Sequence, residues 1–461
     1  MQLPGFLVDL NQIVLTNQPL YLVGGAVRDF LLGRPCKDYD LVCSSDTRGI
    51  ARKFADKAQA AIFTLDGERN TYRVLIGQGS AQQTIVDFAT MQGATIEEDL
   101  ARRDFTINAM ALALDAPQTI IDPFKGGRDL QGGYLRPVSE NSFTTDPLRV
   151  IRAIRYAVDL GLKLEPETSE LLREAVAGLD FVSRERKRDE LFKLLDGRNV
   201  HTAVFLLRHY EVFSHVPLNV EGDFSEVSNR CRVLEELLGW LTATKSVEKQ
   251  AAFHQVSLFV QLARFKEKFQ EHYLLENLSG RTRKALLFLI LLTGDELHTL
   301  KQSDLAALAL SVDEIKAVEK FYDGFSECEK LSDSPQQPTP VEIFYFFQKT
   351  GATGVDLVVY NLVRYRARIG VEFSHDEWLR RLQFANLMLS AWWEHPDLVH
   401  PEPLLNGHEI MQLSGLSAGP IIGEIHDALL HQQVAGKVTT KKQAVDWLAS
   451  WLVDNNERLI K

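Results

Sequence analysis

The first third of the chain alternates short apolar runs with amphipathic stretches. Runs rich in Val, Ile, Tyr and Phe that end at Gly, Asp or Asn favour β-strands. The segments AVRDFLLG and TRGIARKFADKAQA lie between such runs and show the helical period. The head of the chain is therefore predicted to be mixed α/β, with strands at residues 20–23, 39–43, 60–65, 72–77 and 84–89.

Beyond residue 145 the strand signal nearly vanishes, and long amphipathic helical segments follow. Proline-rich stretches at 332–342 and 395–405 interrupt them and are expected to act as linkers. The predicted fold class is α+β, with a mixed-sheet head followed by an elongated helical remainder. We expect a head (1–137), a neck (138–200), a body (201–331) and a tail (332–461).

Composition narrows the function classes. The chain has 461 residues and a formal net charge of −11, which argues against a nonspecific nucleic-acid binder but not against an enzyme with a local basic surface. The four cysteines show no metal-binding spacing, and no apolar run reaches the roughly 18 residues that a membrane span requires. The N-terminus lacks the features of a signal peptide. A cytoplasmic protein with no membrane partner is expected; no oligomeric state is indicated.

The segment LVGGAVRDFLLG suggests a phosphate site. A predicted strand runs into Gly24-Gly25, and a helix then begins. Glycines let the backbone approach a phosphate closely, and the new helix offers free N–H groups. Arg28, in the first turn, could reach the same anion. A tight turn without a ligand is the structural alternative.

A DxD pattern follows. Asp38 and Asp40 flank Tyr39 on a predicted strand, so both carboxylates point to one face. Carboxylates this close repel each other unless a divalent cation lies between them. Such a cation could activate a hydroxyl and hold a triphosphate. Asp87, on a later strand, is a candidate third ligand.

Five ordered motifs carry a resemblance to a known family. GGxVRD with DxD resembles the nucleotidyltransferase superfamily that includes DNA polymerase beta, and the later motifs resemble its class II branch of CCA-adding enzymes and bacterial poly(A) polymerases. The later motifs are RRDFTINAMA (102–111), DPFKGGRDLQGGYLR (122–136), TDPLRVIRAIRYAVDLGL (145–162) and SRERKRDEL (183–191). The resemblance implies template-independent addition of C and A to the 3′ end of tRNA, from CTP and ATP, with release of pyrophosphate.

The resemblance also implies roles for residues. Asp38 and Asp40 would be catalytic and hold Mg²⁺. Gly25, Arg28 and Arg103 would bind the triphosphate, for which arginine's planar fork is suited. The remaining implied roles are sugar bonding or loop support for Asn108, bracing of the head–neck junction for Asp122 and Asp129, and orientation of the recognition helix for Glu185, Arg186 and Glu190.

The stretch TTDPLRVIRAIRY places arginines 149, 152 and 155 along one face of a helix. The resemblance assigns Asp146 and Arg149 to the base edge, where a carboxylate accepts from the exocyclic amino group that C and A share. Arg152 and Arg155 would meet phosphates and the primer end. The family pattern begins with two acids, but Thr145 replaces the first. Thr145 could cap the helix and free Asp146; alternatively, Asp146 is only the N-cap.

Several alternatives stay open. Segment 88–101 is short, which leaves a CC-adding partial enzyme possible, and poly(A) synthesis ranks below it. A non-catalytic RNA-binding protein and a metal phosphohydrolase, suggested by His375-Asp376 and His426-Asp427, are rivals from other classes. The tRNA acceptor arm would meet basic clusters in the helical part of the chain. The candidate clusters are Arg281/Arg283/Lys284, Arg364/Arg366/Arg368 and Lys437/Lys441/Lys442.

Overall fold

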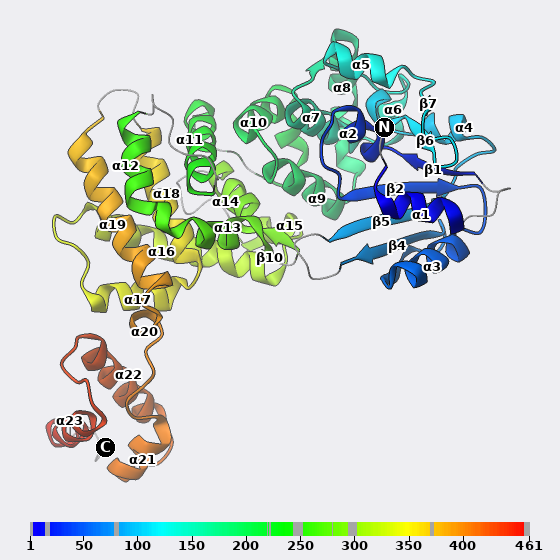
Figure 1. Ribbon diagram of the computed structural model, residues 1–461. Helices are drawn as coiled ribbons and strands as arrows, with labels where there is room; N and C mark the ends of the chain where they lie inside the picture. Colours follow the sequence, from blue (N-terminus) through cyan, green and yellow to red (C-terminus); the bar gives the residue numbers. More distant parts are fainter. Residues whose placement is uncertain are drawn as a thin grey trace. The chain divides into compact units, whose positions relative to one another are not determined.

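The computed structural model describes residues 3–13, 19–77, 83–218, 220, 223–242, 252–278, 280–293, 302–368 and 373–455. The chain divides into two compact units, residues 1–217 and 218–461, and each is described by itself. The predicted α+β class is confirmed, because a mixed sheet occupies the head and helices make up most of the remainder (Figure 1). The finer division into head, neck, body and tail stays a prediction.

Within the described residues, the head contains a seven-stranded sheet in the order β3-β4-β5-β2-β1-β6-β7. Only β2 and β5 pair in parallel; the other neighbours are antiparallel. The strands are β1 (Leu20–Val23), β2 (Asp38–Cys43), β3 (Ala61–Asp66), β4 (Thr71–Ile76), β5 (Thr84–Thr90), β6 (Ala111–Ala113) and β7 (Ile120–Ile121). The five strands expected from the sequence all form, within one residue at each end. The very short β6 and β7 carry too few residues to show a period.

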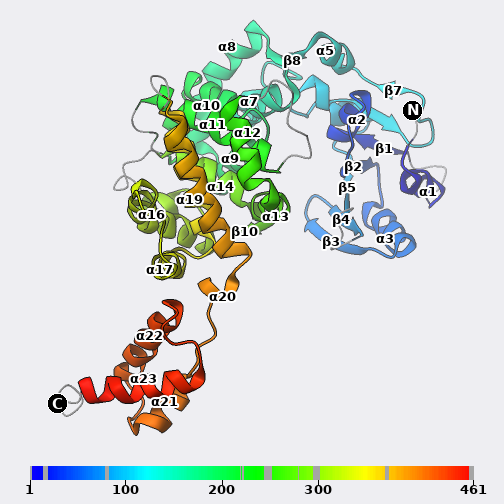
Figure 2. The same ribbon diagram turned by 60° about the vertical axis from the view of Figure 1, so that its left-hand side comes forward.

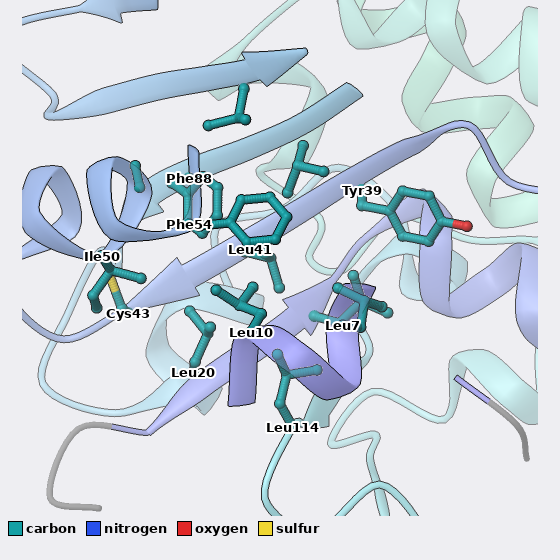
Figure 3. Packing of buried hydrophobic residues seen from close by; sticks show 14 of the residues in the cluster. Leu7, Leu10, Leu20, Tyr39, Leu41, Cys43, Ile50, Phe54, Phe88 and Leu114 are labelled. Atoms are coloured by element: carbon teal, nitrogen blue, oxygen red, sulfur yellow. The ribbon is translucent and has the colours of Figure 1, made fainter. Parts of the chain in front are cut away.

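Side chains of the sheet alternate between two faces. Tyr39, Leu41 and Cys43 of β2 enter a core in which Phe54 of α3 lies against Phe88 of β5, with ring centroids 5.6 Å apart (Figure 3). Asp38 and Asp40, at the alternate positions, lie on the opposite face. The helices of the head are α1 (Gly5–Ile13), α2 (Gly25–Leu31), α3 (Thr47–Ala58), α4 (Ile96–Leu100) and α5 (Gly126–Gly132), with a 3-10 turn at Thr106–Asn108.

The rest of the first unit is helical. Strands β8 (Tyr134–Leu135) and β9 (Lys163–Leu164) form a small parallel pair that joins this part to the chain leaving the head. Helix α7 buries an apolar face made of Val150, Ile151, Ile154 and Ala157. The helices are α6 (Ser142–Thr145), α7 (Arg149–Leu160), α8 (Pro166–Ala175), α9 (Arg184–Leu195) and α10 (Val200–His209), with 3-10 turns at Val176–Phe181 and Val212–His215.

The second unit begins with α11 (Phe224–Thr242), α12 (Phe253–Leu262), a 3-10 turn (Ala263–Phe265) and α13 (Lys266–Leu274). A short hairpin of β10 (Glu276–Leu278) and β11 (Arg281–Thr282) leads to α14 (Arg283–Leu292). Next come α15 (Gln302–Ala307), α16 (Val312–Asp333), α17 (Pro340–Thr350), α18 (Thr353–Ala367), α19 (His375–Trp393) and α20 (Pro396–Val399). In the described part of the chain, no helix is long and apolar enough to cross a bilayer.

The last helices, α21 (Gly407–Ser414), α22 (Pro420–Val434) and α23 (Lys441–Asp454), pack on one another around their own core (Figure 2). The expected linker at 332–342 is a short connection between α16 and α17, and Thr339 caps α17 with Glu342 in a capping box. Its proline and polar content therefore marks a helix start rather than a long tether.

Candidate active site

The turn between β1 and α2 requires glycine. Gly24 has a φ of +71°, in the left-handed region that favours glycine. A Cβ on Gly24 would lie 2.9 Å from Nη1 of Arg103 and 3.4 Å from Oδ2 of Asp40. Because Gly24 has no side chain, the guanidinium of Arg103 and the carboxylate of Asp40 can both lie close to the start of α2. Gly25 is the first residue of α2 and faces the same space.

Asp38 and Asp40 carry the chemistry expected of cation ligands. Among the described residues, neither carboxylate forms a hydrogen bond or an ion pair with another protein group. Desolvation raises the pKa of Asp38, and the nearby Asp87 raises it further. Desolvation also raises the pKa of Asp40; Asp87 and Asp38 add to this, whereas Arg103 opposes it. Paired carboxylates that gain stability from a positive charge fit a divalent cation.

Asp87 differs from these two because an arginine already holds it. Asp40 pairs in register with Asp87 on β5, which pairs with Arg73 on β4. Nε and Nη2 of Arg73 donate to the two oxygens of Asp87 over 2.8 Å each. The sequence suggested Asp87, on a later strand, as a neighbour of the DxD pair, but Arg73 gave no signal because the strand that pairs with β5 was unknown. Whether Asp87 serves as a third ligand stays untested.

Arg28 and Arg103 are both anchored by protein acids or amides. Nη2 of Arg103 lies 3.1 Å from Oδ2 of Asp99, and Arg103 borders the pocket described below. Arg28 is buried; its Nη1 donates to Oδ1 of Asn108 over 2.7 Å, and its side chain also pairs with Asp29. Asn108 therefore supports Arg28, which matches the loop-support alternative for this residue.

The anions that balance the arginine row of α7 lie within the chain. Arg152 donates from Nε and Nη2 to Oδ2 of Asp104, over 3.0 and 2.5 Å. Arg155 donates from Nε to Oε1 of Glu190 over 2.6 Å. Burial alone would lower the pKa of Arg152, but Tyr156, Asp104 and Glu190 outweigh it and raise that pKa. The mutual repulsion expected along this face is thus relieved without a ligand.

Tyr156 is the functional neighbour that sequence reasoning missed. The guanidinium carbons of Arg28, Arg152 and Arg155 lie 5.4, 5.5 and 4.2 Å from the centre of its ring. Cations over an aromatic face are attracted by its quadrupole. Tyr156 follows Arg155 directly and lies four residues after Arg152, so helical spacing was the available signal. Asp104, the acid of the RRD motif, was likewise missed as the partner of Arg152.

Arg149 and Asp146 lie at the start of α7. Arg149 donates to Oγ of Ser142 over 2.6 Å and to the carbonyl of Arg102 over 2.7 Å. Oδ2 of Asp146 accepts from Nη2 of Arg186 over 2.8 Å, and Oδ1 accepts from the N–H of Leu148 over 3.3 Å. The N-cap of α7 is Leu148, so Asp146 accepts from the backbone just before the helix and from an arginine of α9.

The expectation that Thr145 caps the recognition helix is wrong. Thr145 is the last residue of α6, and its Oγ1 donates back to the carbonyl of Asn141 over 2.8 Å. The chain turns at Asp146, which is extended, before α7 begins. The anionic group nearest this turn is therefore Asp146 itself.

The expected bracing of the head–neck junction by Asp122 and Asp129 stays a prediction, because the contacts of Asp122 are local to residues 122–127. Asp122 accepts from the N–H groups of Gly126 and Gly127 over 2.7 and 2.9 Å. Asp129 accepts from Oγ1 of Thr106 and pairs with Arg136. Arg186 and Glu190 of the fifth motif form the ion pairs described above, which agrees with their predicted orienting role.

A polar pocket of about 290 Å³ brings most of these groups together. Its lining includes Asp40, Gly25 and Arg103 from the head motifs and Asp146 with Arg149 from the fourth motif. Asp38, Arg28 and Arg155 are not among the lining residues. The full lining is Gly24, Gly25, Asp40, Arg103, Asp104, Asn108, Asp146, Leu148, Arg149, Arg152, Tyr156 and Arg186.

The basic clusters of the second unit are mostly committed to internal pairs. Arg281 donates from Nη1 to both carboxylate oxygens of Glu314, and Arg283 donates to Asp356 over 2.9 Å. Arg364 is buried and pairs with Glu329. Lys437 and Lys442 are exposed, whereas Lys441 pairs with Glu409.

The rival metal site receives no support. No group of His, Cys, Asp and Glu side chains arranged to hold a metal ion with three or more ligands occurs among the described residues. His375 and Asp376 lie exposed at the start of α19, and His426 contacts only its neighbour Asp427 over 3.5 Å among the recorded pairs.

Known proteins resemble this chain in both sequence and fold. Residues 20–136 match the family described as the poly(A) polymerase head domain, and residues 161–219 match a probable RNA- and SrmB-binding site of polymerase A. The chain is 28% identical to the CC-adding tRNA nucleotidyltransferase of a Synechocystis species, covering 95% of this chain and 96% of that one. It is 29% identical to the A-adding tRNA nucleotidyltransferase of Deinococcus radiodurans, covering 93% and 95%.

These matches support the class II family of CCA-adding enzymes and bacterial poly(A) polymerases, which this chain resembles. The family resemblance and the expected enzyme class, nucleotidyltransferase, are thereby confirmed. A solved structure of a CCA-adding enzyme with ATP has the same fold, with a TM-score of 0.65 at 21% identity, covering 97% of this chain and 94% of that one. Enzymes of this family generally use divalent metal ions, and the carboxylate oxygens of Asp38 and Asp40 are of the kind that such ions prefer.

Proposed function

We propose that this protein adds C and A residues to the 3′ end of tRNA, from CTP and ATP, and releases pyrophosphate. The observation that carries this proposal is the pocket joining Asp40 and Arg103 to Asp146 and Arg149. Gly25, Asp40 and Arg103 suit a triphosphate, and Asp146 with Arg149 suits a base, so a single nucleotide in this pocket accounts for both groups. The relatives named above as CC-adding and A-adding enzymes support the choice of tRNA.

At the phosphate end, Asp38 and Asp40 would hold Mg²⁺, which suits hard carboxylate oxygens. When bound, the ion lowers the pKa of an attacking hydroxyl and holds the triphosphate. Arg103 would neutralise the leaving pyrophosphate, and the N–H of Gly25 at the start of α2 would donate to a phosphate oxygen. Arg28 does not line the pocket, and Asn108 holds its guanidinium, so it would act on the triphosphate from outside the lining.

At the base end, Asp146 would accept a hydrogen bond from the exocyclic amino group of C or A. Arg149 would donate to a ring nitrogen or carbonyl of the same base. Uracil and guanine present a carbonyl at the exocyclic position, which would leave acceptor facing acceptor. An unpaired buried polar group costs about 1–3 kcal/mol, enough to discriminate between the bases.

The proposed phosphate contact of Arg152 is better supported than that of Arg155. Arg152 lines the pocket and could exchange part of its contact with Asp104 for a phosphate. Arg155 donates to the buried Glu190 and lies outside the lining, so its contact with a phosphate or the primer end would require release of that bond.

A CC-adding partial activity is the second candidate. Segment 88–101 is compact: the N–H of Gln92 donates to Asp99 over 2.9 Å, and Thr95 caps α4. A segment tied down in this way supports a fixed pocket that accepts one nucleotide type. The first relative described above is itself a CC-adding enzyme.

The experiment uses tRNA that lacks its 3′-terminal CCA. Wild-type protein is incubated with CTP alone, ATP alone and both together, and the products are resolved on a sequencing gel. We expect CC with CTP and CCA with both. A product that stops at CC with both nucleotides supports the partial activity, and long adenosine tails with ATP alone support poly(A) synthesis. The four free cysteines are in keeping with a cytoplasmic location for this reaction.

A further inference from the structure

Four residues from four neighbouring strands lie in one row across the head sheet. Asp40 of β2 is in register with Asp87 of β5, Asp87 with Arg73 of β4, and Arg73 with Phe63 of β3. Residues directly opposite each other project from the same face, and the bidentate contact of Arg73 with Asp87 agrees with this. The row therefore runs from the catalytic carboxylate to the edge of the sheet.

Phe63 lies on the open face of that edge strand. Its neighbours on β3, Ile62 and Thr64, are in register with the buried Val74 and Tyr72, so they point to the core side. Phe63 points the other way and keeps 44% of its surface exposed. A single exposed aromatic side chain is ordinary on a protein surface. Phe63 is a candidate for a functional role because it lies in the same row as Asp40.

The in-line geometry of the proposed reaction places the acceptor RNA on the side of the sheet that holds β5, β4 and β3. The nucleotide pocket is lined by Gly24 and Gly25, which follow β1, and by Asn108, which precedes β6. β1 and β6 lie on one side of β2, while β5, β4 and β3 lie on the other. In an in-line displacement the attacking and leaving oxygens lie on opposite sides of the phosphorus. The attacking hydroxyl must then approach from the side of β5.

We propose that Phe63 stacks on a base near the 3′ end of the acceptor RNA and so positions its terminal hydroxyl at Asp38 and Asp40. This inference rests on the proposed function. Strands lie about 4.8 Å apart, so three spacings place Phe63 about 14 Å from Asp40. That distance corresponds to about four stacked nucleotides at roughly 3.4 Å each, which matches a short single-stranded end. Aromatic side chains stack on any base, which suits an end whose sequence changes as it grows.

Arg73 makes the row between Asp40 and Phe63 compatible with the negative charge of RNA. Without it, Asp87 would place a further carboxylate charge between Asp40 and Phe63, where the phosphates of the acceptor must pass. Arg73 neutralises that charge through two hydrogen bonds and is itself about one third exposed. From β2 to the sheet edge, the row therefore contains the candidate cation ligand Asp40, the neutralised pair of Asp87 and Arg73, and the exposed aromatic side chain of Phe63.

The test compares Phe63→Ala, Phe63→Trp and a control, Val8→Ala. Val8 is also an exposed apolar residue of the first unit, at 50%, but it lies on α1, outside the row and outside the RNA-binding match at 161–219. Equilibrium binding is measured by anisotropy with labelled tRNA that ends in CC and so keeps a single-stranded 3′ end, and KM is measured for tRNA and for CTP on tRNA lacking CCA. Phe63→Ala should weaken tRNA binding by about fivefold to a hundredfold, Phe63→Trp should restore it, and the control should match wild type. The KM for CTP should stay constant.

A second RNA separates stacking from a general loss of affinity. When the single-stranded 3′ nucleotides are removed from the labelled tRNA, wild type and Phe63→Ala should bind it equally. Equal binding of the untrimmed tRNA by wild type and Phe63→Ala would overturn the inference, as would an effect that persists on the trimmed tRNA. If the wild type extends no tRNA at all, the proposed function fails instead, and the anisotropy comparison still decides whether Phe63 meets RNA.

Discussion

Nη2 of Arg186 lies 2.8 Å from Oδ2 of Asp146, so an arginine of α9 holds the carboxylate that is proposed to recognise the base. A carboxylate can accept several hydrogen bonds, and this pair leaves further acceptor positions on Asp146. The fifth motif thus orients the fourth across forty residues of sequence. Without Arg186, the carboxylate could rotate away from the pocket.

The first prediction concerns Asp146 itself. Asp146→Ala should reduce the preference for CTP over UTP by about tenfold to a hundredfold, because the acceptor for the exocyclic amino group is lost. The measurement is kcat/KM for each nucleotide on one tRNA. If the ratio is unchanged while the melting temperature falls, Asp146 has only a structural role.

The second prediction separates orientation from recognition. Arg186→Ala should lower kcat/KM for CTP by about tenfold, since hydrogen bonds to charged groups contribute about 1.5–3 kcal/mol. Adding Asp146→Ala to this variant should cost little more, because the arginine acts through the aspartate. Losses that simply add in the double variant would show that Arg186 acts independently.

The third prediction concerns the stability of the α7 arginine row. Arg152→Met removes the partner of Asp104, whose side chain is only 8% exposed, and should lower the free energy of unfolding by about 3 kcal/mol. The matched control is Arg52→Met, because Arg52 and Asp56 form an exposed pair, where about 0.5 kcal/mol is expected. Chemical denaturation of both variants is the measurement. Equal small losses would mean that Asp104 does not depend on Arg152.

The fourth prediction concerns Arg73. Arg73→Met leaves Asp87 unpaired beside the DxD carboxylates and should tighten divalent cation binding by about fivefold, as removal of one nearby positive charge predicts. Binding of Mn²⁺ without nucleotide, followed by electron paramagnetic resonance, measures this apart from activity. The double variant Arg73→Met with Asp87→Asn should return to the wild-type affinity. Unchanged Mn²⁺ affinity in the single variant would contradict the neutralising role.

The fifth prediction is a pH dependence in the second unit. Burial would raise the pKa of Asp356, but His272 and Arg283 outweigh it and hold that pKa below the ordinary 3.8. A depressed folded-state pKa stabilises the protein fully above the unfolded-state pKa, and this stability is lost as the pH falls through the folded value. Acid unfolding below about pH 4 should therefore be shallower in Asp356→Asn than in wild type. Identical slopes would exclude Asp356 as a contributor.

Much of the site could be predicted because its residues recur at local spacings. The Gly24-Gly25 turn and the alternation of Asp38 and Asp40 each depend on a few adjacent residues, and local periodicity determines their geometry. The five long strands carry the same kind of signal. The helix that begins near Asp146-Pro147 was visible too, although α7 starts only at Arg149 and neither Thr145 nor Asp146 is its N-cap.

The long-range partners could not be predicted in this way. Arg152 meets Asp104 and Arg155 meets Glu190 across 48 and 35 residues of sequence. No feature of the local sequence distinguishes an arginine that pairs within the protein from an arginine that binds a phosphate. Arg73 likewise needs the register of β4 against β5 before its contact with Asp87 is apparent. Charge on one helix face is thus a poor guide to ligands until the neighbouring elements are known.

The most direct test of the account follows labelled CMP from CTP onto tRNA that lacks its 3′ end, with wild type and Asp38→Ala side by side. Asp38 is exposed on β2, and its carboxylate makes no hydrogen bond within the described residues, so the variant should keep the wild-type melting temperature. We predict efficient labelling by wild type and a loss of at least about a thousandfold in Asp38→Ala, since cation stabilisation of the transferring phosphoryl group supplies several kcal/mol. Labelling by a folded Asp38→Ala at a rate near wild type, or none by wild type, would contradict the central claim.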